Sequence, residues 1–127
     1  MTRTLDLTLE PWELAVSRLP PDAPVPDWAM RGALYSITRT PAELSIVCAA
    51  DAVPEGVRAE KGWRCFRFAG PIAFDETGVL SSVAAPLAAA EIGIFAISTF
   101  DTDYLLVPGR KLEAALLALE AAGHRVR

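Results

Sequence analysis

Five polar residues lie close together between two apolar stretches in the second half of the chain. They are Ser98, Thr99, Asp101, Thr102 and Asp103. The flanking residues 92–97 and 104–107 are rich in β-branched and aromatic side chains, which favours two short buried strands joined by a tight connection. Hydroxyls and carboxylates at the ends of buried strands either stabilise a turn or bind a ligand. The pattern alone leaves both interpretations open.

A second stretch that could bind a ligand, Thr77-Gly78-Val79-Leu80-Ser81, opens a helix predicted over residues 79–91. The first N–H groups of a helix have no intrahelical partner and carry the positive end of its dipole, so they suit a carboxylate. Gly78 would allow close approach to the backbone, and Thr77 or Ser81 could add a hydroxyl. The structural alternatives are that Gly78 is a turn residue and that Thr77 is the helix N-cap.

Together the two stretches offer complementary groups for a free amino acid. A carboxylate would bind at the helix start, and an ammonium would suit Ser98, Thr99 and the carbonyls around Ile97. Asp101 or Asp103 could neutralise its charge. The alternative for these aspartates is turn formation, because Asp side chains bond to their own backbone.

The sequence contains no recognisable catalytic or metal-binding set. His124 is the only histidine and follows a predicted helix, which suggests a solvated or capping residue. Cys48 and Cys65 lie in predicted strands without CxxC spacing, so they are expected to be buried thiols. The chain has no Asn and no Gln, which excludes a Cys–His–Asn triad. We therefore expect no enzymatic activity, no catalytic residues, no metal and no cofactor.

Composition narrows the class of protein further. The chain has 127 residues, of which 52% are hydrophobic, enough to bury a sizeable core. Its net charge of −4 disfavours nucleic acid and anionic membranes as partners. No apolar run approaches the roughly 20 residues of a membrane span, and the N-terminus does not resemble a signal peptide. These features predict a cytoplasmic protein.

Hydrophobic periodicity predicts short strands alternating with helices. Leu5, Leu7 and Leu9 alternate in a strand over residues 4–9, whereas Pro11 begins a predicted short helix. Pro86 is expected to bend the helix over 79–91 or make it irregular. The other predicted elements are a hairpin of strands 33–38 and 43–48, a strand over 62–68, a helix over 111–122 and a final strand over 124–127.

The order of these elements predicts an α+β fold. From residue 62 onwards it reads βαββαβ, which is the ferredoxin-like order of an antiparallel sheet with helices on one face. Residues 1–61 repeat this order imperfectly. We therefore predict two ferredoxin-like units in tandem, with an abbreviated first unit at residues 1–61 and a second unit at residues 62–127.

Specific residues in the second unit resemble the ACT-domain family. The similarity is carried by Gly70-Pro71, Phe74, Thr77-Gly78-Val79-Leu80, Pro86-Leu87 and the stretch from Ile92 to Val107. Residues 43–48 and Gly62-Trp63-Arg64 are also similar. Within the family, the chain more closely resembles the small free-standing bacterial ACT proteins related to the arginine sensor CASTOR and to the regulatory domains of aspartokinases. The resemblance covers residues 43–124 and is most specific over residues 92–107.

The resemblance implies two tandem ACT units and a regulatory sensor that binds an amino acid without catalysis. In the family, the ligand lies at an interface between ACT units, so a homodimer or higher homo-oligomer is expected. One wall would be the loop that opens the first helix, and the other a neighbouring strand and turn. The implied ligand-binding residues are Thr77, Gly78, Val79, Leu80, Ser81, Ile97, Ser98, Thr99, Phe100 and Asp101.

A second hypothesis is a structural or protein-interaction ACT module that pairs with itself or with an enzyme and binds no ligand. It rests on residues 94–97, whose alternating side chains give both faces of an expected central strand an apolar surface. One face would pack on the helices, and the other would need cover from the first unit or another subunit.

Overall fold

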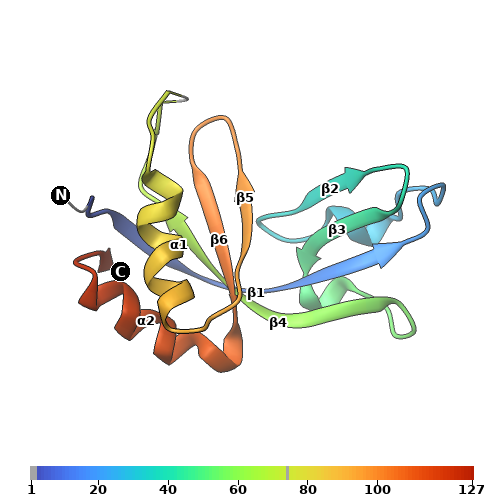
Figure 1. Cartoon of the computed structure of the whole chain (residues 1–127). Coiled ribbons are helices and arrows are strands. Elements are labelled where there is room, and N and C mark those ends of the chain that lie inside the picture. The colour runs from blue at the N-terminus through green and yellow to red at the C-terminus, as the bar shows by residue number, and fades with distance from the viewer. Residues whose placement is uncertain (1–2, 74) are drawn as a thin grey trace. The chain divides into compact units, whose positions relative to one another are not determined.

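The computed structural model describes residues 3–73 and 75–127, so Phe74 of the ACT-like motif lies outside the described residues. The chain divides into two compact units (Figure 1). The first unit contains residues 1–11 together with 64–127, and the second contains residues 12–63. The second unit is therefore inserted in the chain between two parts of the first. This grouping differs from the predicted division into 1–61 and 62–127, because the first eleven residues belong with the C-terminal part.

The first unit is a mainly antiparallel sheet with two helices. Strands β1 (Asp6–Leu19) and β4 (Arg58–Phe68) contribute residues to both units. The other elements are α1 (Val79–Ala89), β5 (Phe95–Ser98), β6 (Asp103–Pro108), the 3₁₀ helix η3 (Gly109–Lys111), α2 (Leu112–Ala121) and β7 (Arg125–Val126). The strand order is β7-β1-β4-β6-β5, with β7 parallel to β1. Both helices and the β5–β6 hairpin are confirmed close to their predicted positions.

The core of the first unit lies between the sheet and its two helices. Alternation in β4 directs Phe66 and Phe68 to this side, where both are fully buried. The helices contribute buried residues that include Val83 and Leu87 of α1 and Leu119 of α2. Because residues of both helices belong to one core with strand residues, α1 and α2 cover the same face of the sheet, as predicted.

The second unit has its own small core and contains no α-helix in residues 12–63, all of which the structure describes. It comprises β2 (Ser36–Arg39), β3 (Leu44–Ala49), the 3₁₀ helices η1 (Asp27–Met30) and η2 (Ala50–Ala52), and the adjoining parts of β1 and β4. Strand β3 pairs antiparallel with both β1 and β2. Buried core residues include Ala15, Ala29, Leu44 and Ile46.

The helix predicted from Pro11 to Leu19 is wrong, because these residues continue β1. From Leu14 to Leu19 the strand is paired with β3, in a register that runs from Leu14↔Ala49 to Leu19↔Leu44. Pairing with residues about thirty positions away satisfies the hydrogen-bonding groups of this backbone. The pairing therefore overrides the helix predicted from the local spacing of the apolar residues. Without that helix, the tandem repeat of βαββαβ is not confirmed.

Strand β5 lies at an edge of the sheet and not in its centre as expected. Its one paired neighbour in the strand order is β6, with registers from Phe95↔Leu106 to Ser98↔Asp103. Ala96 and Ser98 of β5 are exposed, whereas Phe95 and Ile97 are half-buried. Among the described residues, neither helix is long and apolar enough to cross a membrane.

Candidate functional site

The start of α1 presents backbone donors that no side chain caps. Gly78 is the N-cap residue, with φ 77° and ψ 1°, and it makes no capping hydrogen bond. The first helical bond runs from the Ser82 N–H to the Gly78 carbonyl, at 3.1 Å. The N–H groups of residues 79–81 precede that bond and therefore have no acceptor within the helix. The alternative in which Thr77 caps the helix is wrong.

The serine hydroxyls of the first turn of α1 are bonded to the helix itself. The Ser81 hydroxyl donates to the Gly78 carbonyl at 3.2 Å, and the Ser82 hydroxyl donates to the Val79 carbonyl at 2.7 Å. Because each hydroxyl uses its hydrogen in this way, its oxygen is left as an acceptor. The donors at this end of the helix are therefore backbone groups.

The connection between β5 and β6 is held by its own hydrogen bonds. The Thr99 N–H and hydroxyl both donate to the Thr102 carbonyl, at 2.8 and 3.0 Å. The Thr102 N–H donates to the Thr99 hydroxyl at 3.3 Å, and the buried Thr102 hydroxyl donates to the Phe68 carbonyl at 2.8 Å. The structural interpretation therefore holds for Thr99 and Thr102, whose polar groups stabilise the turn.

A pocket of about 620 Å³ lies between α1 and the β5–β6 connection, and we call it the helix–hairpin pocket. It brings together most of the residues that the sequence selected, and all of its walls belong to the first unit. Its lining residues are Ile72, Ala73, Glu76, Gly78, Val79, Leu80, Ser81, Ala84, Ser98, Thr99, Phe100, Thr102 and Asp103.

Three of the predicted site residues do not line this pocket. Thr77 lines a different pocket, described below. Ile97 pairs with Tyr104, one position along from the Ser98↔Asp103 pair, so its side chain points to the other face of β5. Asp101 lies in the connection, where its carbonyl accepts the Ile72 N–H at 2.7 Å.

Two acidic residues of the lining were not among the implied ligand-binding residues: Glu76, and Asp103, which the sequence offered only as a group that could neutralise the ammonium. Asp103 lies directly opposite Ser98 in the β5–β6 register, so the hairpin alternation could have placed it on the same face. Glu76 lies in the segment that leads into α1, where no periodic pattern marks it. These two acidic residues are the charged side chains that line the helix–hairpin pocket, and its lining includes no Lys, Arg or His.

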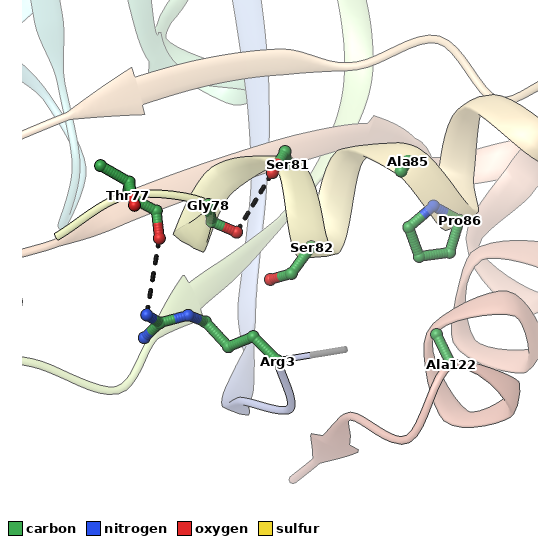
Figure 2. A pocket seen from close by; sticks show the side chains of 8 residues that line it. All are labelled: Arg3, Thr77, Gly78, Ser81, Ser82, Ala85, Pro86 and Ala122. Atoms are coloured by element: carbon green, nitrogen blue, oxygen red, sulfur yellow. Dashed lines mark hydrogen bonds between the residues drawn. The ribbon is translucent and has the colours of Figure 1, made fainter. Parts of the chain in front are cut away.

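A second pocket, of about 650 Å³, lies on another side of the first turns of α1 (Figure 2), and we call it the Arg3 pocket. Thr77, Gly78, Ser81 and Ser82 line it. Its other lining residues are Arg3, Ala85, Pro86 and Ala122. Gly78 and Ser81 line both pockets, so the start of α1 is the wall that they share.

Arg3 connects the N-terminal segment to the turn that opens α1. Its Nη1 lies 3.0 Å from Glu76 Oε2, and its Nη2 donates to the Thr77 carbonyl at 3.5 Å, as Figure 2 shows for Thr77. Glu76 Oε1 accepts the Ala73 N–H at 3.5 Å. Both side chains of the ion pair are substantially exposed, at 42% and 38%.

His124 is a buried structural residue and not a solvated one. Its Nε2 lies 2.7 Å from the Ser82 carbonyl oxygen, and its Nδ1 accepts a hydrogen bond from the Leu5 N–H at 3.1 Å. Pro86 follows Ser82 by four residues and has no N–H, so it leaves that carbonyl without its helical donor. With Nδ1 as an acceptor, the ring hydrogen lies on Nε2, which donates to that carbonyl.

Both cysteines are confirmed as buried free thiols. Burial raises the pKa of the Cys65 thiol to about 12, helped by the nearby Glu10 carboxylate. Burial also raises the pKa of the Cys48 thiol, with a smaller effect from Asp51. In the described part of the chain, no group of three or more His, Cys, Asp or Glu side chains could hold a metal ion.

The sequence matches two family descriptions. Residues 58–121 match the ACT domain, and residues 13–56 match a family described as an N-terminal domain. A crystal structure of a protein from Agobacterium tumefaciens is 46% identical over 98% of this chain and 93% of that chain, with a TM-score of 0.93.

Two other similar proteins have names that describe a sensor or a regulatory subunit. The human cytosolic arginine sensor for mTORC1, subunit 1, is 51% identical over 47 residues, which are 36% of this chain and 14% of the sensor. The alignment thus spans a small part of the sensor's length. The regulatory subunit of aspartate kinase from Thermus thermophilus has a TM-score of 0.65 at 15% identity and covers 97% of this chain and 99% of that chain. At that identity, the likeness concerns the fold.

Proposed function

Since the chain belongs to the ACT-domain family, we propose that it is a cytoplasmic regulatory protein that binds a free amino acid in the helix–hairpin pocket and catalyses no reaction. The observation that carries this proposal is the pocket itself. Within one unit, it combines the uncapped start of α1 with two acidic side chains. An amino acid carries a carboxylate and an ammonium close together, and this pair of charges matches the two kinds of group.

The ligand carboxylate binds to the backbone donors of residues 79–81. These N–H groups have no helical acceptor, and the helix dipole favours a negative charge at this end. Gly78 lacks a side chain, so its backbone can be approached closely. The ligand ammonium lies toward Glu76, Asp103 and the hydroxyl oxygen of Ser98, all of which line the same pocket.

Arginine is the first ligand to test. The acidic lining of the helix–hairpin pocket suits a second positive charge on the ligand. The name of the human relative, an arginine sensor, supports the same choice. Amino acids with a neutral side chain bring only the α-ammonium to the two acidic groups and should bind more weakly.

A thermal-melting screen of the full chain against the twenty amino acids tests the function. A ligand that binds the native state stabilises it by about 2.7 kcal/mol at a ligand concentration of a hundred times its Kd. The melting temperature therefore rises with ligand concentration. We expect arginine to give the largest shift. If none of the twenty amino acids shifts the melting temperature at millimolar concentration, the proposal fails.

Two neighbouring residues of α1 locate the site. Ala84 lines the helix–hairpin pocket, and Ala85 lines the Arg3 pocket. Ala84→Trp should fill the first pocket and abolish the arginine-induced shift, whereas Ala85→Trp should leave it. The opposite result would move the ligand to the Arg3 pocket, and loss in both variants would require a fold check by circular dichroism.

The edge strand β5 supports a second candidate function, self-association through this ACT unit. Edge strands are common places for chains to associate, and the exposed large apolar residues Ile94 and Phe100 lie beside β5 in the chain. Analytical ultracentrifugation at micromolar concentration tests this function. A homodimer or higher homo-oligomer supports it, and a monomer contradicts it.

A further inference from the structure

The Arg3–Glu76 ion pair occupies a carboxylate that the ligand would need. Glu76 lines the helix–hairpin pocket, whereas Arg3 lines the pocket on another side of the same turn. The guanidinium contacts Glu76 Oε2 at 3.0 Å and the Thr77 carbonyl at 3.5 Å. These are acceptors of the kind that a cationic ligand group would also seek.

The structure allows this contact to open at low cost. Both side chains are substantially exposed, at 42% and 38%. Exposed pairs of this kind contribute little to stability, because water competes for both charges. Arg3 lines the pocket drawn in Figure 2, so its guanidinium could leave Glu76 without having to be buried.

We infer that Arg3 is an intramolecular competitor for the cationic group of the ligand at Glu76. This inference rests on the proposed amino-acid site and adds regulation to it. A ligand that brings its own ammonium or guanidinium to Glu76 displaces Arg3, and the N-terminal segment then loses its tether to the turn that opens α1. Ligand binding is thereby coupled to the position of Arg3, whereas Leu5 stays bonded to His124 and Arg125. A ligand without a cationic side chain leaves more of the pair intact.

Calorimetric titration of the full chain with arginine and with citrulline, its neutral isostere, tests the competition. Arg3→Ala should tighten arginine binding about two- to five-fold, which corresponds to removal of a surface ion pair. The same substitution should change citrulline binding by less. Arg3→Lys keeps a cation at the position, so its affinity for arginine should stay close to that of the unchanged protein.

Two further variants separate competition from a general effect of charge or folding. Arg125→Ala removes another exposed, ion-paired arginine of the same unit, which bonds to Asp6 at 2.7 Å, and should leave arginine binding unchanged. Glu76→Gln should weaken arginine binding, and adding Arg3→Ala to it should then have no further effect. That loss of additivity is the signature of a shared partner.

The outcomes distinguish this inference from the proposed function. If Arg3→Ala weakens arginine and citrulline equally, Arg3 supports the turn and does not compete, and the inference is overturned while the site stands. Unchanged arginine binding in Arg3→Ala also overturns it. If no variant binds either compound, the proposed function itself fails.

Discussion

The two walls of the helix–hairpin pocket are both polar, but they differ in how many of their groups are already bonded. On the hairpin wall, Thr99 is bonded to the Thr102 backbone, and the Thr102 hydroxyl donates to the Phe68 carbonyl. On the helix wall, the N–H groups of residues 79–81 precede the first helical bond, and Gly78 provides no cap. The polar groups of Thr99 and Thr102 therefore hold the fold, whereas the N–H groups of residues 79–81 are available to a ligand.

The largest expected change in stability comes from His124, which bonds to the Ser82 carbonyl of α1 and so supports the helix wall. His124→Leu would leave the Leu5 N–H and the Ser82 carbonyl without their partners, and should lower the free energy of unfolding by about 2–4 kcal/mol. Urea unfolding measures this loss. Leu117→Ala on the exposed surface of α2 is the control and should change stability by less than about 0.5 kcal/mol. An effect of His124→Leu no larger than the control's would contradict the supporting role.

The next effect tests the hairpin wall. Thr102→Val keeps the side-chain shape and removes the hydroxyl that donates to the Phe68 carbonyl, so it should cost about 1–3 kcal/mol of stability. Ser98→Ala on the same wall is exposed and should cost less than about 0.5 kcal/mol. If Ser98→Ala proved the more destabilising of the two in urea, the assignment of structural roles along this wall would be wrong.

A smaller effect is expected at Gly78, where the helix wall begins. Its φ of 77° is costly for other residues, whereas an added Cβ would meet nothing closer than 3.9 Å. Gly78→Ala should therefore cost about 1 kcal/mol through backbone conformation alone. Gly93→Ala is the matched control, because that glycine has open space and no positive φ. Thermal melting of the two variants compares them, and equal melting temperatures would argue against strain at Gly78.

The last prediction concerns the thiols, which lie outside both walls and affect stability only at alkaline pH. Because the pKa of Cys65 is raised to about 12, its thiolate is scarce in the native protein even at pH 9. The free energy of unfolding should fall as the pH rises from about 9 toward 12, because the Cys65 thiol ionises readily in that range only in the unfolded chain. A thiol-reactive dye should label Cys48 and Cys65 in denaturant and leave both unlabelled in the native state. Rapid native labelling would contradict their burial.

Local patterns predicted the parts of the fold that are held by nearby residues. The helix over 79–91, the helix over 111–122 and the hairpin that contains Ser98 could be identified because each buries a periodic face. Residues 11–19 could not, since their pairing with Leu44–Ala49 is a non-local contact that no local pattern records. The grouping of residues 1–11 with the C-terminal part depends on a non-local contact too, the pairing of Asp6 and Leu7 with Arg125 and Val126.

The candidate site followed the same rule. Gly78 and Ser81 were found from the helix start, and Ser98 from the end of a buried strand. Glu76 was missed because its role depends on the pocket and on Arg3, which is 73 positions away in the chain. His124 was misjudged because its partner, the Ser82 carbonyl, is 42 positions away and is left without a helical donor by Pro86.

One measurement tests the difference between the two walls most directly. In an NMR titration of the ¹⁵N-labelled chain with arginine, the amide signals of Val79, Leu80 and Ser81 should move in proportion to bound ligand. The amides of Thr99 and Thr102 are already bonded within the turn and should move less. Saturable shifts at Thr99 and Thr102, with none at residues 79–81, would contradict the account.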